Sequence, residues 1–365
     1  MSEEKIMILN MVKEGKISVE EAHDLLEAVE EKSEKTGGHH TDKEKLKIDL
    51  DEMKADLKDG LKDFGKTMEG TFRSVVKGFK SLNLGNVVST AFGAAKESAE
   101  KELILSADGL TGINLKTQSG DLSVTGGDAN DVLIQAVVTA RGSDSENAKE
   151  RAEEIEVIYD IEDGSLNVKD SGTKMQITGP YSVDYTITVP RKFDVKLQTM
   201  DGDVVIRYID GDIGVNNYSG DIHCKECSES IKINTKSGDI EIDGFTGVIG
   251  LRTLSGDLIL SDVVSGAVSC NTLSGDISGQ INPTTNANIS AKTISGDIEL
   301  GIDIAAELSI SADTLSGDIS CNLPVHGTET KEHRFTAILN SDSGNMNLST
   351  KSGDISLHPL EKEEI

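Results

Sequence analysis

Large aromatic side chains are nearly absent from this chain of 365 residues. It contains no tryptophan, and aromatic residues make up 3% of the sequence, whereas glycine occurs 36 times. Aromatic side chains supply much of the buried area of a broad core. Their scarcity therefore excludes a core built on rings, and it favours a thin, repetitive core of valine, isoleucine and leucine.

Cysteine and long apolar runs are scarce as well. The cysteines are Cys224, Cys227, Cys270 and Cys321. No run reaches the roughly 18 apolar residues that would cross a membrane, and the first residues do not resemble a signal peptide. Few cysteines are typical of a reducing compartment with free thiols. We therefore expect no conventional secretory route, and a cytoplasmic protein or one bound peripherally to a membrane.

Positive charge is outweighed by negative charge. The formal net charge is −28, and most of it falls in residues 102–365. Nucleic-acid binding needs clustered cations against the phosphates, so we expect no nucleic-acid partner for this region. Acidity on this scale favours solubility or a cationic partner, and cationic peptides are the candidate ligands.

What the chain has instead is a repeated phrase, Ser-Gly-Asp, usually after Thr and before Ile, Leu or Val. Complete copies lie at 119–121, 219–221, 237–239, 255–257, 274–276, 295–297, 316–318 and 352–354. From residue 199 to 314 the copies recur at intervals of about 18 to 21 residues, as in stacked repeat proteins. Glycine supplies the positive φ of a tight turn, and Ser and Asp can hydrogen-bond the turn backbone. We predict structural turns at Gly220, Gly238, Gly256, Gly275, Gly296, Gly317 and Gly353.

The constant phase of the repeat predicts a mainly β fold, a β-solenoid of stacked coils, over residues 102–365. The hydrophobic residue after each Asp then points inward and forms a column. The alternative is an antiparallel β-repeat sandwich with Ser-Gly as the hairpin turn. A capping box at Ser143–Glu146 predicts a short helix ending near Glu154. The longer last interval, 314 to 350, predicts an inserted loop or a widened final coil.

One Asp per coil could also form a row of carboxylates that binds Ca²⁺. Calcium-binding β-rolls use a nine-residue phrase with two glycine-rich half-sites, and that phrase is absent. The pattern therefore favours aspartates that form turns. Their combined field could still attract cationic peptides.

The first part of the chain is predicted to be helical. Residues 1–32 form a helical hairpin whose second helix opens with a capping box at Ser18–Glu21. Because residues 1–32 can bury only a small area by themselves, we expect this hairpin to need a partner or a second copy. Residues 33–45 form a polar linker, and residues 46–101 an amphipathic helical segment.

The amphipathic segment has apolar residues at steps of three and four, with an eleven-residue period that keeps the stripe straight. Its second half is basic and has Phe on the apolar side. Such a helix can lie in a membrane interface; the alternative is packing on its own protein or on a copy of itself. The residues predicted to contact a membrane are Lys66, Phe72, Arg73, Lys77, Phe79 and Lys80.

No arrangement of residues predicts catalysis. Cys224 and Cys227 form a CxxC pair with His223 beside it, which leaves a thiol or metal-binding protein as an alternative. A redox pair needs a helix N-terminus to lower the thiol pKa, and a single pair is weak evidence for zinc. We therefore expect no enzyme, no cofactor and no bound metal.

Two stretches resemble known families. Residues 4–22, with the "EGKIS-EEA" core that runs into Leu25 and Leu26, resemble the SHOCT-like helical domain. Residues 185–190, with the Ser-Gly-Asp-Ile series behind them, resemble the β-strand-repeat family labelled "putative adhesin". Both in this order resemble the YvlB and LiaX group of Gram-positive bacteria.

That resemblance implies a non-enzymatic, regulatory role in the cell-envelope stress response, in which membrane damage or cationic antimicrobial peptides are sensed. It also implies a cell-surface location despite the missing signal peptide, and it supplies no catalytic residues. Residues 1–101 are then expected to contact a protein partner or a membrane. A further alternative is a structural, adhesin-like surface protein that forms homo-oligomers through open solenoid ends.

Overall fold

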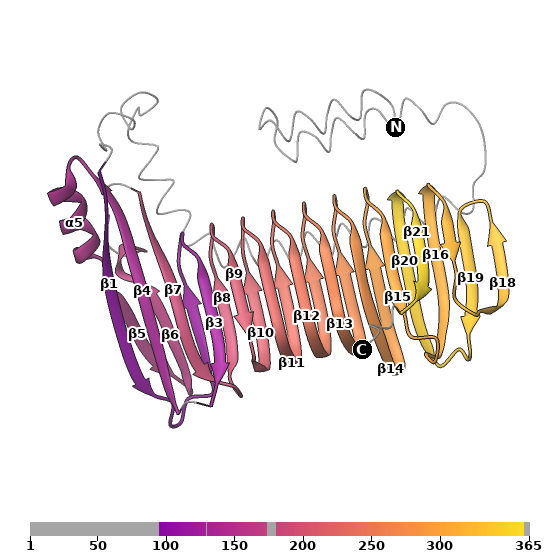
Figure 1. The fold of residues 1–365 in the computed structure, drawn as a ribbon, viewed down its shortest axis with the longest axis horizontal. Helices are drawn as coiled ribbons and strands as arrows, with labels where there is room; N and C mark the ends of the chain where they lie inside the picture. The colour runs from indigo at the N-terminus through magenta and orange to yellow at the C-terminus, as the bar shows by residue number, and fades with distance from the viewer. Residues whose placement is uncertain (1–94, 129, 174–179, 361–365) are drawn as a thin grey trace, which may run out of the picture. The chain divides into compact units, whose positions relative to one another are not determined.

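The computed structural model describes residues 95–128, 130–173 and 180–360. The predicted helical hairpin, the linker and the candidate membrane-contacting residues lie outside these ranges. The described residues form a β-solenoid with one α-helix (Figure 1). This confirms the stacked architecture over the antiparallel sandwich, because the successive coils pair in parallel.

The longest strands, β11 to β14, lie in the middle of the solenoid. The N-terminal strands are β1 (Ala95–Ser106), β2 (Gly112–Lys116), β3 (Leu122–Gly127), β4 (Asp131–Gly142), β5 (Val157–Glu162), β6 (Ser165–Asp170) and β7 (Tyr181–Pro190). The middle strands are β8 (Asp194–Gln198), β9 (Val204–Arg207), β10 (Asp210–Asn216), β11 (Ile222–Asn234), β12 (Ile240–Arg252), β13 (Leu258–Asn271) and β14 (Ile277–Lys292). The C-terminal strands are β15 (Ile298–Ile302), β16 (Leu308–Ser316), β17 (Ile319–Cys321), β18 (His326–Lys331), β19 (Arg334–Leu339), β20 (Gly344–Ser352) and β21 (Ile355–Pro359).

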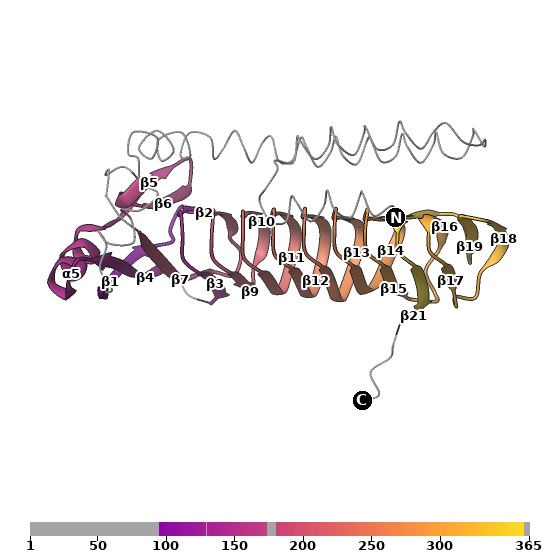
Figure 2. The ribbon, with the colours of Figure 1, turned by 90° about the horizontal axis from the view of Figure 1, so that it is seen from above.

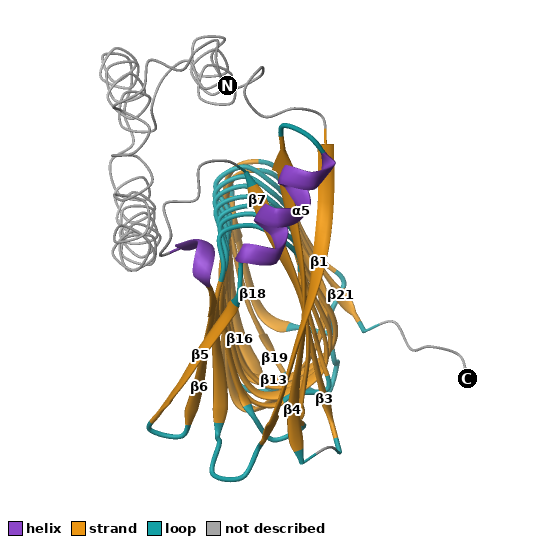
Figure 3. Ribbon diagram, turned by 90° about the vertical axis from the view of Figure 1, so that its left-hand side faces the viewer, coloured by secondary structure: helices purple, strands orange, loops and turns teal. Residues whose placement is uncertain are grey.

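The coils form two walls, seen end-on in Figure 3. Wall 1 contains, in spatial order, β1, β4, β7, β3, β9, the first halves of β11 to β14, then β15, β21 and β17. Wall 2 contains β5, β6, β2, β8, β10, the second halves of β11 to β14, then β20, β16, β19 and β18. Each long strand therefore crosses from wall 1 to wall 2 within one coil.

Coils near both ends are stacked out of sequence order. The pair β2–β3 lies between β6–β7 and β8–β9. Likewise β20–β21 lies between β14–β15 and β16–β17. The long last interval of the repeat is thus neither a widened coil nor only an inserted loop. It contains the antiparallel hairpin β18–β19 and the return of the chain into a gap between two earlier coils.

The core is a column of aliphatic side chains between the walls. The residues after the turn aspartates are stacked in register and are buried, with exposed fractions of 0–1% for Val204, Ile222, Ile240, Leu258, Ile277, Ile298 and Ile355. The Thr before each turn is buried as well, and its hydroxyl donates to a turn carbonyl, as from Thr272 Oγ1 to Gly256 O at 3.2 Å. A buried hydroxyl with such a partner avoids the cost of an unpaired polar group.

The N-terminal end differs from the prediction in two details. Strand β1 begins at Ala95, so residues 95–101, expected in the helical segment, pair with β4 instead. Helix α5 (Ser145–Glu154) is capped by Asp144 rather than Ser143, because Asp144 accepts a hydrogen bond from the backbone N–H of Asn147 at 2.9 Å. The helix buries Ala148 and Ala152 at this end of the solenoid (Figure 2).

Candidate functional site

The Ser-Gly-Asp turns lie along one edge of the solenoid, where the chain passes from wall 2 to wall 1. Their glycines have positive φ, from 122° at Gly220 to 152° at Gly353. At Gly256 a Cβ would lie 2.1 Å from the carbonyl oxygen of Gly238 in the next coil. Glycine is therefore required by both the turn and the stacking, since a side chain would push neighbouring coils apart.

The aspartates of these turns form a continuous ladder of hydrogen bonds. Each carboxylate Oδ1 accepts the backbone N–H of the Asp in the next coil, as from Asp276 N to Asp257 at 2.7 Å and from Asp297 N to Asp276 at 2.8 Å. We call this row the Asp ladder. In spatial order it contains Asp184, Asp121, Asp203, Asp221, Asp239, Asp257, Asp276, Asp297, Asp354 and Asp318. The bonds that these carboxylates accept run between coils, so the aspartate side chains connect the turn backbones of adjacent coils.

The ladder is nevertheless a surface feature. Its aspartates are exposed, apart from the half-buried Asp257. Adjacent coils of parallel strands lie about 4.8 Å apart, so neighbouring carboxylates are held close together. Two like charges at this spacing repel by about 1 kcal/mol in water. The edge therefore concentrates negative potential along the whole solenoid.

A second row runs along the same turns, two positions before each glycine. Its members are linked from coil to coil by backbone bonds, as from Ser274 N to Leu254 O and from Ser295 N to Leu273 O at 3.1 Å. Most are apolar and at least partly exposed: Met200, Tyr218, Leu254, Leu273, Ile294 and Leu315. The other positions hold Gln118, Lys236 and Lys351. We call this the apolar row. Sequence reasoning missed it, although the variable second position of the Thr-x-Ser-Gly-Asp phrase carries the signal.

The CxxC pair lies in the core, on the opposite side of β11 from His223. Alternation along β11 places His223 outward, whereas Cys224 and Cys227 are buried in the core at 1% and 4% exposure. Burial raises the pKa of all four thiols, that of Cys270 to about 12. A protonated thiol is a poor nucleophile. Within the described ranges there is no cluster of His, Cys, Asp and Glu that could hold a metal ion.

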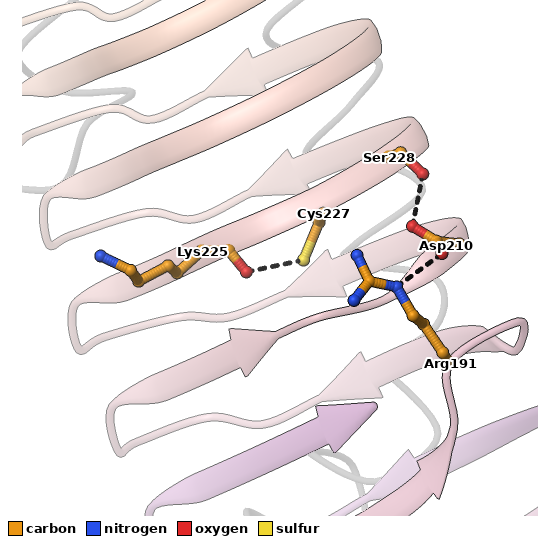
Figure 4. Close-up of polar contacts among 5 residues, drawn as sticks. All are labelled: Arg191, Asp210, Lys225, Cys227 and Ser228. Atoms are coloured by element: carbon orange, nitrogen blue, oxygen red, sulfur yellow. Dashed lines mark hydrogen bonds and ion pairs between the residues drawn. The ribbon is translucent and has the colours of Figure 1, made fainter. Parts of the chain in front are cut away.

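Polar contacts around Cys227 stabilise the opposite corner of the coil (Figure 4). The Cys227 thiol donates to Lys225 O at 3.3 Å. Asp210 accepts from Ser228 Oγ at 2.7 Å and pairs with Arg191 Nε at 2.7 Å. The hydrogen bond from Ser228, aided by Arg191, holds the pKa of Asp210 below its ordinary value. The two contacts of Asp210 link neighbouring coils.

The geometry defines a β-solenoid with a long turn edge, along which the Asp ladder and the apolar row run. The chain belongs to the Toastrack DUF4097 family, whose model matches residues 94–243 and 135–358. A SHOCT-like domain model matches residues 3–34. Both resemblances found in the sequence are therefore confirmed. No curated protein matches the chain.

Several solved structures match this chain at low sequence identity and low TM-score. One is a "putative adhesin" from Bacteroides fragilis, at 14% identity and a TM-score of 0.42, with 72% of this chain and 97% of that chain covered. Another is a "putative cell adhesion protein" from Clostridium sporogenes, at 11% identity and a TM-score of 0.26. The match covers 72% of this chain and 100% of that chain. A third is a "putative lipid binding protein" from Parabacteroides distasonis, at 10% identity and a TM-score of 0.26. The match covers 74% of this chain and 98% of that chain.

In the part of the chain that the structure describes, no helix is long and apolar enough to cross a membrane.

Proposed function

We propose that this protein is a non-enzymatic binding and regulatory protein of the cell envelope, and that its turn edge binds cationic, amphipathic peptides. The observation that carries the proposal is the Asp ladder with the apolar row beside it. A peptide with one cationic and one apolar face matches both rows at once.

The ladder supplies a physical reason for such binding. Each Oδ1 is held by the backbone N–H of the next coil, so the row of charge is fixed before a ligand arrives. A cationic peptide relieves the repulsion between neighbouring carboxylates, while the apolar row removes hydrophobic side chains from water. The cost of ordering the site is small because the coils are already rigid.

Sensing then connects two modules. The β-solenoid takes up the peptide, and residues 1–94 pass the event on through a membrane surface or a protein partner. The SHOCT-like match at residues 3–34 supports a separate helical module in this part of the chain. The expected biological setting is the response to envelope damage.

The test is a binding titration of the full chain with a cationic amphipathic peptide. In the ladder variant Asp239→Asn, Asp257→Asn and Asp276→Asn are combined, because Asn keeps the Oδ1 acceptor and removes the charge. The matched control combines Asp163→Asn, Asp262→Asn and Asp342→Asn, which change the net charge equally and lie outside the ladder. We expect the ladder variant to lose about tenfold or more in affinity, roughly 0.5 kcal/mol per charge.

Equal affinities of the ladder variant and the control variant would overturn the proposal. Affinity that does not change between low and high salt would overturn it too, because exposed charges are screened by salt.

A further inference from the structure

From β6 to β14, every charged side chain at the two outward positions of wall 2 nearest the ladder turns is basic, although the chain carries a net charge of −28. Side chains alternate between the core and the outside along each strand. From β6 to β14 the outward basic residues of wall 2 are Lys169, Lys116, Lys196, Lys232, Arg252 and Lys292. The outward acidic residues on the same strands, Asp194, Asp210 and Asp212, and the exposed Glu229 lie farther from the ladder turns. We call this surface the basic face.

Strand register aligns the basic residues into rows. In the row nearest the ladder turns, Lys116 lies opposite Lys169, Asn234 opposite Arg252, and Asn271 opposite Lys292. This row continues through amides, and Asn234 Nδ2 donates to Asn216 Oδ1 at 3.2 Å. With strands about 4.8 Å apart, the basic residues extend along about 34 Å of the solenoid axis.

The middle row alternates lysine with glycine: Lys196, Gly214, Lys232, Gly250 and then Ser269 are in register on adjacent strands. Lys196 and Lys232 are exposed. A Cβ on Gly214 would meet only Lys196 Cγ at 3.6 Å, and one on Gly250 only Ile231 O at 3.8 Å, and neither glycine has positive φ. The fold does not require these glycines, and they leave shallow gaps between the lysines.

The chemistry of the face selects a linear polymer with spaced negative charges and hydroxyl groups. Lysine ammonium groups bind phosphate as point charges, and Asn and Ser side chains can donate to and accept from hydroxyls. No aromatic side chain lies among the outward residues of these strands, so no platform exists on which bases or sugar rings could stack.

We propose that the basic face binds a linear polyol-phosphate polymer, laid along the solenoid axis with its phosphodiesters against the lysines and its hydroxyls against the amides. The proposal is independent of peptide binding at the turn edge, which has the opposite charge. A protein with both surfaces would hold an anionic envelope polymer on one face and a cationic peptide on one edge.

The experiment measures binding of fluorescent poly(glycerol phosphate) to the full chain at low and at higher salt. The face variant combines Lys196→Glu and Lys232→Glu, and the matched control combines Lys149→Glu and Lys331→Glu. Each lysine near an anionic partner contributes to the free energy of binding. The face variant is therefore expected to lose about tenfold or more in affinity. The control variant, with the same change of net charge, should bind like the unmodified chain.

A second variant, Gly214→Leu, changes no charge and fills the gap between the two lysines. It should also weaken binding, while circular dichroism shows the same β content. Single-stranded DNA and polygalacturonate of matched charge serve as competing polymers, and both should bind more weakly.

The proposal is overturned if the full chain does not bind poly(glycerol phosphate), or if the face and control variants bind it equally. Tighter binding of DNA or of polygalacturonate would equally overturn it, because the face would then not select a polyol phosphate.

Discussion

The backbone N–H of Asp354 donates to Oδ1 of Asp297 at 2.8 Å, across 57 residues of sequence. The N–H of Asp318, which comes earlier in the chain, donates in turn to Oδ1 of Asp354 at 2.8 Å. The last coil in sequence is therefore inserted between two earlier coils. The Asp ladder remains continuous across this insertion, so the ladder follows the spatial order of the coils and not their order in the chain.

Because this coil is inserted between two others, we expect its stability to be sensitive to substitution at Gly344, where β20 begins. A Cβ there would lie 2.7 Å from Ala287 O and 2.9 Å from Glu307 O, on the coils that flank the insertion. We expect Gly344→Ala to lower the free energy of unfolding by about 1–3 kcal/mol. Gly214→Ala is the control, since its Cβ has room. Urea denaturation measures both, and equal midpoints would show that the coil is not held between the other two.

The ladder bonds predict different effects of Asn and Ala at one position. In Asp276→Ala the N–H of Asp297 loses its acceptor, whereas Asp276→Asn keeps an oxygen in its place. We expect the Ala variant to be less stable than the Asn variant by about 1 kcal/mol. Thermal unfolding of the two variants checks this. A more stable Ala variant would mean that repulsion between the carboxylates outweighs their hydrogen bonds.

The thiols are predicted to be unreactive in the folded protein. Cys224, Cys227 and Cys270 are buried, and burial raises the pKa of each. Alkylation by iodoacetamide at pH 8 should therefore be slow in buffer and fast in concentrated urea, as followed by mass spectrometry. Cys321 is only partly buried and should react first. Rapid reaction at Cys224 or Cys227 in buffer would revive the thiol alternative.

Asp210 predicts a pH-dependent contribution to stability. Its pKa is lowered in the folded state by Ser228 and Arg191. A group with a depressed folded pKa stabilises the fold above its unfolded value, near 4, and loses that effect as the pH falls through the folded value. The stability difference between the unmodified chain and Asp210→Asn should therefore be present at pH 7 and shrink below pH 4. A difference that does not change with pH would contradict this assignment.

The repeated core could be predicted from the sequence because its signals are local. The glycine of each turn, the aspartate beside it and the aliphatic residue after it are read from one phrase. The column from Val204 to Ile355 is buried as that phrase indicates, except for Ile319, which is partly buried. The out-of-order coils could not be predicted in this way. The Ser-Gly-Asp phrase at 352–354 resembles the others. The position of its coil is set by the pairing of β20 with β14 on one side and β16 on the other.

The basic face also escaped sequence reasoning. Its basic residues come from strands far apart in the chain, from Lys116 on β2 to Lys292 on β14. Strand register brings Lys196 and Lys232 to one surface and directs the Asp ladder to another. The charge of this protein is thus segregated by the fold, which a net charge cannot reveal.

The most direct test of the central claim is where a cationic peptide touches the protein. A spin-labelled amphipathic cationic peptide, titrated into the isotopically labelled full chain, broadens the NMR signals of nearby amides. We predict that broadening is concentrated on the amides of the Asp ladder and the apolar row, such as those of Asp257, Leu273 and Asp276, and is removed by high salt. Broadening confined to the outward residues of wall 2, or absent from the turn edge, would contradict the account.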